Sequence, residues 1–330
     1  MKKIINRVDS ITEEMVGGFV KTNSDRVKRI PDTCAVVRTD KEFANSAHVG
    51  IVSGGGSGHE PLHLGFIGEG MLSAAVAGQV NTSPTPDQIY EAIKAADKGQ
   101  GVLLIVKNYA GDVMNFEIAQ ELAYFDDYRV KTIVVDDDIS VEDDGENQGR
   151  RGVAGTVLVE KICGAAAQNG MDLDSLAKLG QEVIDSTKTI GLALSAATVP
   201  AIGHPGFELK DDEMEYGVGI HNERGYATKK LVSSEKMATD LVDKIIAEFG
   251  SKSGEYAVLV NGLGATPLME QYIFANDVLN KLSAKKVNIT FAKVGNFVTS
   301  IDMHGISLTI TKLSNNWKEY LNQGTKAIAW

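Results

Sequence analysis

The sequence lacks the features of secreted and membrane proteins. It contains only two cysteines, Cys34 and Cys163, both in apolar surroundings. Two such cysteines build no disulfide framework and suit a reducing compartment. No apolar run approaches the ~20 residues of a membrane-spanning helix, and the N-terminal MKKIINRVDS has no signal-peptide core. We therefore expect a soluble cytoplasmic protein that does not enter a membrane.

Basic charge is also scarce. The sequence has 33 Lys and Arg residues and 44 Asp and Glu residues, which gives a formal net charge of -11. Nucleic acids and anionic membranes attract basic surfaces, so this imbalance argues against both as partners. The content of 43% hydrophobic and 23% charged residues is typical of a globular protein, and 330 residues suffice for two domains.

Strand-like and helix-like segments alternate along the chain. The apolar stretches HVGIV, GVLLIVKN and VKTIVVDDD predict buried strands, and EMEYGVGIH, EYAVLVNGLG, KVNITFAKVG and GISLTITKL predict strands in the second half. Helical patterns lie between them. The alternation predicts an α/β fold with two domains, residues 1–186 and 187–330, each with a largely parallel or mixed sheet flanked by helices.

Two helix starts carry recognisable signals. Ser10 and Glu13 have the spacing of a capping box before an apolar face. Thr85 and Pro86 have the types preferred at the N-cap and at the first helical position. We therefore expect helices to begin directly after Ser10 and Thr85.

An acidic stretch, DDDISVEDDGENQGRR at 136–151, follows a predicted strand. It has the composition of a divalent-metal site, but runs of charge are usually solvated loops. We predict a solvated loop and no metal site.

The stretch SGGGSGHEPLH at 53–63 contains candidates for two kinds of nucleotide loop. A Walker loop places lysine after its last glycine, whereas His59 follows Gly58. The dinucleotide fingerprint, started at Gly54, requires glycine at position 59. Neither nucleotide-binding loop fits.

The same stretch matches the zinc-protease pattern H-E-x-x-H from His59 to His63. That pattern binds zinc only when both histidines share one face of a helix. Pro61 lies between them, and proline is tolerated only in the first helical turn. If Pro61 opens a helix, His59 lies in the loop before it and the zinc geometry is lost.

A ligand site at the ends of strands remains. In open α/β sheets, ligands bind beyond the carboxyl ends of the strands. A glycine-rich turn with Gly56, Ser57 and His59 follows one predicted strand, and Lys107, Asn108 and Asp112 follow another. Asp112 also suits a simple helix N-cap.

A third candidate, His221, ends the glycine-interrupted stretch EYGVGIH. An isolated histidine at such a place is more often structural than catalytic. His59, Asp112 and His221 all follow predicted strands, and this coincidence favours a ligand-binding site.

Several long segments resemble a known family. They are VSGGGSGHEP, GEGMLSAAVAGQVNTSPTPDQI, GVLLIVKNYAGDVMNFE, RRGVAGTVLVEKICGAAA, MEYGVGIHNERG, LVNGLGATPLMEQY and TSIDMHGISLTI. Together they resemble the dihydroxyacetone-binding K subunit of dihydroxyacetone kinase over nearly the whole chain.

The resemblance implies roles for individual residues. It implies that His221 forms a covalent hemiaminal with the carbonyl carbon of dihydroxyacetone. It implies that His59 and Asp112 flank the hydroxyl that accepts the phosphoryl group. The turn from Gly56 through Ser57 and Gly58 to His59, together with Lys107, is expected to line the substrate pocket.

The resemblance also implies partners. Relatives with their own ATP site carry an extra helical domain, and no such segment follows Trp330. We therefore expect a stand-alone K subunit with no cofactor of its own. ATP or ADP and Mg²⁺ would belong to a separate nucleotide-binding L subunit, which a phosphocarrier of the phosphotransferase system recharges.

The family further implies a homodimer with a doubly wound α/β fold. The alternative is a non-catalytic paralogue that binds dihydroxyacetone and acts as co-activator of a transcriptional regulator. Such paralogues depart from the kinase subunit at TSPTPD and near NYAGD, and both segments are kinase-like here.

Overall fold

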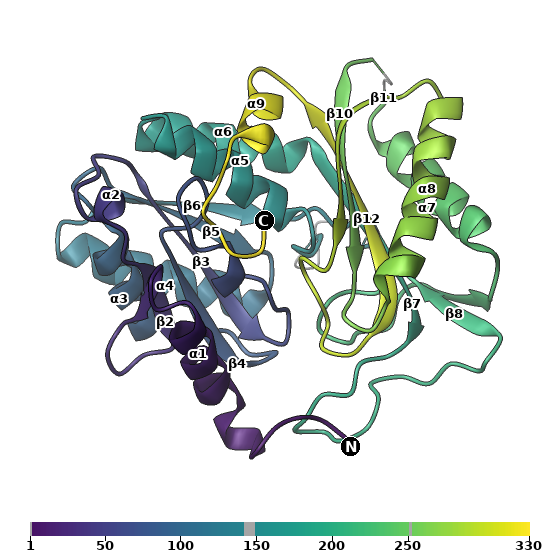
Figure 1. The fold of residues 1–330 in the computed structure, drawn as a ribbon, viewed down its shortest axis with the longest axis horizontal. Coiled ribbons are helices and arrows are strands. Elements are labelled where there is room, and N and C mark those ends of the chain that lie inside the picture. The colour runs from purple at the N-terminus through teal and green to yellow at the C-terminus, as the bar shows by residue number, and fades with distance from the viewer. Residues whose placement is uncertain (1, 142–148, 251–252) are drawn as a thin grey trace. The chain divides into compact units, whose positions relative to one another are not determined.

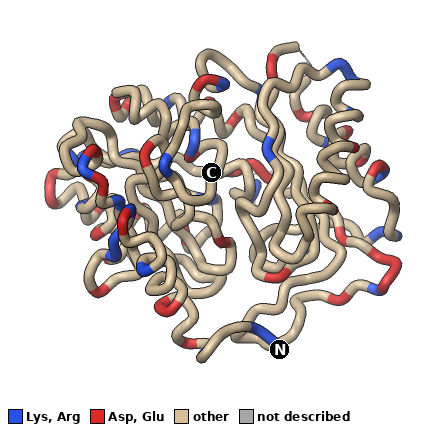
Figure 2. Tube along the Cα trace, in the orientation of Figure 1, with Lys and Arg blue, Asp and Glu red and all other residues tan. Residues whose placement is uncertain are grey.

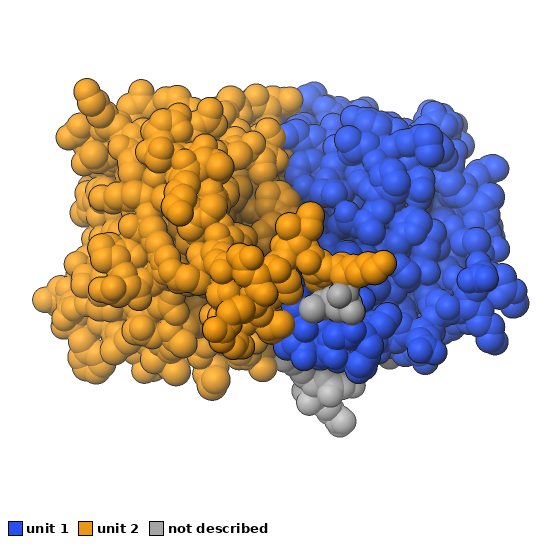
Figure 3. All heavy atoms as spheres, turned by 60° about the horizontal axis from the view of Figure 1, so that its bottom comes forward, with its two compact units in different colours: residues 1, 136–155, 184–319 blue, residues 2–135, 156–183, 320–330 orange. Residues whose placement is uncertain are grey.

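The computed structural model describes residues 2–141, 149–250 and 253–330. They form two compact units, drawn in different colours in Figure 3. Unit 2 contains residues 2–135, 156–183 and 320–330, and unit 1 contains 136–155 and 184–319. The domain boundary at 186/187 stays a prediction. The compact units differ from it in three segments: residues 136–155 and 184–186 belong to unit 1, and residues 320–330 belong to unit 2.

Unit 2 is built on a mixed six-stranded sheet with the order β1-β2-β4-β3-β5-β6 (Figure 1). Strands β4, β3, β5 and β6 run parallel, whereas β1 and β2 add antiparallel pairs at one edge. The strands are β1 (Val27–Arg29), β2 (Ala35–Arg38), β3 (Gly50–Ser57), β4 (Ala74–Val80), β5 (Val102–Lys107) and β6 (Val130–Val135).

Helices cover both faces of this sheet. Apolar residues of α3 and α4 pack with those of β3, β4 and β5 in one core, and α5 contacts β3 and β5 on the opposite face (Figure 1). The helical elements are η1 (Val8–Ser10), α1 (Ile11–Thr22), α2 (Lys41–Ala44), η2 (Leu64–Phe66), α3 (Pro86–Ala96), α4 (Ala110–Phe125), α5 (Thr156–Gln168) and α6 (Leu173–Asp185).

The predicted helix starts are confirmed, but not the capping box. Ser10 precedes α1, yet its hydroxyl donates to Glu14 and to the Arg7 carbonyl instead of capping the helix. Pro86 occupies the first turn of α3 after Thr85, whose side chain makes no capping hydrogen bond. The fixed φ of proline starts this helix without a side-chain cap.

Unit 1 contains a second six-stranded mixed sheet with the order β11-β10-β12-β7-β8-β9. Strands β10 and β11 run parallel, and the other neighbours run antiparallel. The strands are β7 (Thr187–Ser195), β8 (Glu213–Tyr216), β9 (Ala227–Lys230), β10 (Glu255–Gly262), β11 (Asn288–Gly295) and β12 (His304–Leu313).

Helices α7 (Ser234–Glu248) and α8 (Leu268–Ala284) share an apolar core with this sheet, and α9 (Trp317–Asn322) follows β12. The two mixed sheets with their helices confirm the predicted fold class. Figure 2 shows Lys and Arg interspersed with Asp and Glu along the trace of both units. In the part of the chain that the structure describes, every helix is too short or too polar to cross a membrane.

The solvated-loop prediction for the acidic stretch is wrong at its start. Asp137 and Asp138 are buried in unit 1. The Asp137 carboxylate accepts hydrogen bonds of 2.8 and 2.7 Å from the amides of Val153 and Gly155, and burial raises the pKa of Asp137 to about 6. These carboxylates connect residues 137–138 to residues 151–155, since buried polar groups need hydrogen-bond partners. Residues 142–148 of the stretch lie outside the described residues.

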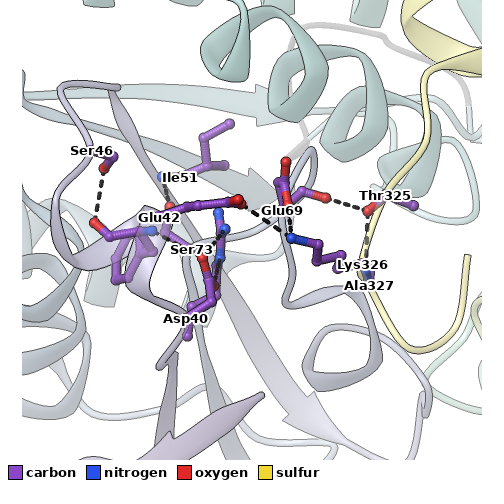
Figure 4. Close-up of polar contacts among 11 residues, drawn as sticks. Asp40, Glu42, Ser46, Ile51, Glu69, Ser73, Thr325, Lys326 and Ala327 are labelled. Atoms are coloured by element: carbon purple, nitrogen blue, oxygen red, sulfur yellow. Dashed lines mark hydrogen bonds and ion pairs between the residues drawn. The ribbon is translucent and has the colours of Figure 1, made fainter. Parts of the chain in front are cut away.

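The C-terminal segment of unit 2 packs over the loop that joins η2 to β4 (Figure 4). The Thr325 hydroxyl donates to the Glu69 carbonyl at 2.5 Å, and Lys326 Nζ lies 2.6 Å from the Glu69 carboxylate. The amide of Ala329 donates to the Gly65 carbonyl at 2.9 Å. This contact supports the chain that directly follows the HEPLH stretch.

We expect Gly68→Ala to weaken this contact. A Cβ at position 68 would lie 2.3 Å from the backbone nitrogen of Ala327, and the backbone cannot yield as a flexible side chain does. The expected loss is about 1–3 kcal/mol in the free energy of unfolding, measured in urea.

Gly17→Ala is the matched control, because a Cβ there meets nothing within 4 Å on α1. It should stabilise the protein by about 0.5–1 kcal/mol. Equal effects of the two substitutions would contradict the close approach at Gly68.

Candidate functional site

The candidate site of unit 2 lies where its sheet topology reverses. Strand β3 lies between β4 and β5, so the chain leaves β3 for one neighbour and then crosses to the other. Ligands of open α/β sheets bind at the carboxyl ends of the strands beside such a reversal. Strand β3 ends at Ser57 and β5 ends at Lys107. The predicted residues His59, Lys107 and Asp112 follow or end these two strands.

The glycines of SGGGSGH do not form the predicted turn. Gly54, Gly55 and Gly56 lie within β3 and pair with β4, and the left-handed turn comes only at Gly58, with φ of 106°. A Cβ at Gly55 would lie 2.4 Å from Lys107 Nζ and 3.3 Å from an Asp112 carboxylate oxygen. Glycine is therefore required in the strand because charged side chains approach its backbone.

His59 is fully buried in the segment after β3. The amide of Gly58 donates to the Glu60 carboxylate at 3.0 and 3.1 Å, which closes this turn. Contrary to the prediction of a helix entrance, Pro61 opens no α-helix: residues 60–63 are a turn that leads into η2. His59 and His63 therefore do not share a helical face, and the geometry of a zinc protease is absent.

Ser57 and Lys107 are also buried at this edge. The Ser57 hydroxyl donates to the Gly78 carbonyl at 2.6 Å, so its proton is used to hold β3 to β4. The Lys107 ammonium contacts three acceptors: the Gly54 carbonyl at 3.3 Å, His63 Nε2 at 2.9 Å and Asp112 Oδ2 at 3.5 Å. The contacts to Gly54 and His63 are within hydrogen-bonding distance, whereas the 3.5 Å separation from Asp112 is that of a looser ion pair.

Asp112 belongs to the first turn of α4 and is 4% exposed. It is not the N-cap, since Tyr109 occupies that position. Negative charge is stabilised at a helix N-terminus, and Lys107 adds a cation on the other side. The carboxylate is thus held in a buried position beside Lys107.

Two residues of this cluster, His63 and Glu160, are not predicted as site residues from the sequence. His63 Nδ1 lies 2.6 Å from Glu160 Oε1 on α5, and its Nε2 contacts Lys107. Burial, together with Lys107 and His59, holds the pKa of His63 well below its ordinary value. Burial raises the pKa of Glu160 to about 8, against the pull of Lys107. With both ring nitrogens engaged, His63 has no lone pair for zinc.

The candidate site of unit 1 is the loop after β8. The strand predicted from EMEYGVGIH ends at Tyr216, because Gly217 has φ of 77° and leaves the extended conformation. His221 follows in this loop with its side chain 19% exposed. Its amide donates to Glu223 Oε2 at 2.9 Å, and its Nδ1 lies 3.8 Å from Glu223 Oε1.

Glu223 is a third residue of the candidate sites that the sequence does not indicate. Its carboxylate lies within ion-pair distance of the His221 imidazole and accepts from the His221 amide. Arg151 steadies the loop: it donates to the Gly217 carbonyl at 2.9 Å and lies 2.7 Å from the Asp138 carboxylate. The arrangement presents a partly exposed imidazole suited to nucleophilic attack.

Comparison with known proteins identifies the family. The Dak1 domain matches residues 17–329. A dihydroxyacetone-binding subunit DhaK of the PTS-dependent dihydroxyacetone kinase of Lactococcus lactis subsp. lactis is 55% identical over 331 residues, covering 100% of this chain and 99% of the relative. DhaK of PTS-dependent dihydroxyacetone kinase 1 of Listeria innocua is 56% identical over 332 residues, covering 100% of both.

A solved structure named as the dihydroxyacetone kinase operon co-activator DhaQ superposes with a TM-score of 0.90 at 40% identity, covering 96% of this chain and 98% of its own. The family match and the structural similarity both extend over nearly the whole chain. The protein therefore belongs to the Dak1 domain family.

Proposed function

We propose that this chain is the dihydroxyacetone-binding subunit of a PTS-dependent dihydroxyacetone kinase. The observation that carries the proposal is the buried Asp112 carboxylate, 3.5 Å from Lys107 Nζ at the topological reversal of the unit 2 sheet. Identities of 55% and 56% with kinase subunits over their full lengths support it. The finer steps below are part of the proposal.

The first proposed step is covalent capture by His221. The Nε2 lone pair attacks the carbonyl carbon of dihydroxyacetone, and the carbonyl π electrons move to its oxygen. That oxygen takes a proton from solvent while Nδ1 gives one up to solvent by way of Glu223, so a neutral hemiaminal forms with no net change in protons. The Glu223 carboxylate near Nδ1 can receive the released proton. Glycerol has no carbonyl and cannot be captured in this way.

The second proposed step is phosphoryl transfer to the terminal hydroxyl. Asp112 accepts the hydroxyl proton as the oxygen attacks phosphorus, and His59 hydrogen-bonds the reacting oxygen. Gly56, Ser57, Gly58 and Lys107 line the substrate position in this proposal.

The proposal includes partners. The phosphoryl donor would be ATP with Mg²⁺ on a separate L subunit, and a phosphocarrier of the phosphotransferase system would recharge the resulting ADP. The names of the relatives as PTS-dependent kinase subunits support this arrangement. We also propose that the chain is a cytoplasmic homodimer.

One further function has specific support. The co-activator DhaQ has nearly the same fold, with a TM-score of 0.90. Its sequence is 40% identical, against 55% and 56% for the kinase subunits. The kinase is therefore the better supported function, and the co-activator is the alternative.

A reconstituted assay tests the choice. The protein, an L subunit and its phosphoryl source should convert dihydroxyacetone to dihydroxyacetone phosphate, while glycerol should give no product. Omitting either this chain or the L subunit should stop the reaction. Adduct formation in the mass spectrum without any product would contradict the kinase and support the co-activator.

A further inference from the structure

A buried row of ionisable groups extends from Asp112, in the candidate site of unit 2, to Glu160 on α5 of the same unit. Asp112 Oδ2 lies 3.5 Å from Lys107 Nζ, Nζ lies 2.9 Å from His63 Nε2, and His63 Nδ1 lies 2.6 Å from Glu160 Oε1. Each of the four residues is at most 6% exposed. Desolvation makes each of these groups costly unless it is paired, so the arrangement needs a reason beyond packing.

The chemistry of the groups determines which nitrogen of His63 carries its proton. An ammonium is only a donor, so His63 Nε2 must accept from Lys107. The proton of the neutral imidazole therefore sits on Nδ1 and is donated to Glu160 Oε1. Oε1 can accept whether or not the other carboxyl oxygen is protonated. Lys107 and Glu160 thus favour the same tautomer from opposite sides of the ring, and Glu160 stabilises the form of His63 that accepts from Lys107.

The same chemistry excludes a proton wire. A wire would have to pass a proton through Lys107, and a charged ammonium has no lone pair to receive one. What His63 and Glu160 can do is hold the Lys107 ammonium in place. His63 and Asp112 compete for Nζ, and His63 is nearer, at 2.9 Å against 3.5 Å.

We infer that His63 and Glu160 are positioning residues that hold the Lys107 ammonium back from Asp112, so that the carboxylate stays available to the substrate hydroxyl. This inference rests on the proposed role of Asp112. Without an acceptor at position 63, Lys107 would close onto Asp112. A tight ion pair would occupy a lone pair that the hydroxyl needs and would weaken the carboxylate as a base.

The other charged or titratable groups around His63 do not replace this role. His59, from the turn after β3, is among the groups that lower the pKa of His63. Cys163 lies on α5 with Glu160, and burial raises the pKa of its thiol to about 12, so it stays neutral. Among the contacts described, the acceptor that draws Lys107 away from Asp112 is therefore His63, with the Gly54 carbonyl as a longer contact at 3.3 Å.

The kinetic test compares two pairs of variants in the full kinase assay. His63→Leu and Glu160→Leu should lower kcat by about 10- to 100-fold, the usual effect of misplacing a group by an ångström. The acid limb of the kcat profile should move to lower pH, because a closer cation lets the base ionise more readily. His63→Gln and Glu160→Gln keep an acceptor oxygen and should retain kcat within about threefold.

Equal losses in the Leu and Gln variants with an unmoved acid limb would overturn the inference and leave only a structural role. Using two positions keeps the test informative if one Leu variant fails to fold.

A second readout needs no turnover. In ¹⁵N NMR of the substrate-free protein, His63 should show a protonated Nδ1 and an unprotonated Nε2. Glu160→Leu should populate the other tautomer more than Glu160→Gln does, because it removes the acceptor of the Nδ1 proton. A proton on Nε2 in the unmodified protein would overturn the inference. If the unmodified protein gives no dihydroxyacetone phosphate, the proposed function fails, while this spectrum still decides the arrangement of Lys107, His63 and Glu160.

Discussion

Replacing His221 with alanine should abolish the dihydroxyacetone adduct and reduce turnover by about 10⁴-fold or more, since covalent attachment is a large source of proximity. The physical reason is the loss of the imidazole nitrogen that acts as nucleophile in the proposed capture step. Intact-protein mass spectrometry after incubation with dihydroxyacetone measures the adduct, and the coupled assay with the L subunit measures turnover.

His204→Ala is the matched control, because His204 is an exposed histidine of the same unit. The control should form the adduct and turn over as the unmodified protein does. An adduct that persists in His221→Ala would refute the assignment of the covalent anchor, and another nucleophile would have to be found.

Asp112→Asn should separate capture from transfer. We expect the adduct to form normally, because its chemistry belongs to His221, while kcat falls by about 10²- to 10⁴-fold through loss of the general base. The amide is isosteric with the carboxylate but cannot take the hydroxyl proton. Mass spectrometry and steady-state kinetics on the same preparation give both results.

Asp127→Asn provides the same change of charge at an exposed position of unit 2. Its left-handed φ of 59° suits asparagine as well as aspartate, so folding should be unaffected. Turnover in Asp112→Asn equal to that of this control would remove Asp112 from the catalytic role.

Predictions from local pattern were correct where local rules govern the chain. Continuous apolar runs gave β5 and β6, and Thr85 with Pro86 gave the start of α3. Lys107 and Asp112 were placed at a strand-to-helix junction because they follow an apolar run within a few residues. These features depend on residues adjacent in the sequence, so they can be predicted from the sequence.

Predictions failed where distant segments change the local outcome. The glycines before His59 suggested a turn, but Gly55 is in a strand because it pairs with β4, a segment distant in sequence. Asp137 and Asp138 read as solvated charge, but they accept bonds from backbone amides and from Arg151. Neither partner set can be seen from the residues adjacent in sequence.

His63 and Glu160 show the limit most clearly. They are 97 positions apart, and α5 brings them together by packing on β3 and β5. The one signal in the sequence is a charged pair, Glu160 and Lys161, inside an apolar helix that buries both. Buried charge of this kind demands a partner, but nothing in the sequence says which partner it finds.

The sequence by itself determined the α/β class, the strand ends that carry Lys107 and Asp112, and the residues that the family resemblance marks as a site. These follow from periodicity and residue type, which are properties of short segments. Only the tertiary structure decided that β3 runs through the glycines, that Lys107 lies nearer to His63 than to Asp112, and that His63 contacts Glu160. The reason is physical: hydrogen bonding and desolvation depend on distances between atoms, and only the packed sheet and helices set those distances.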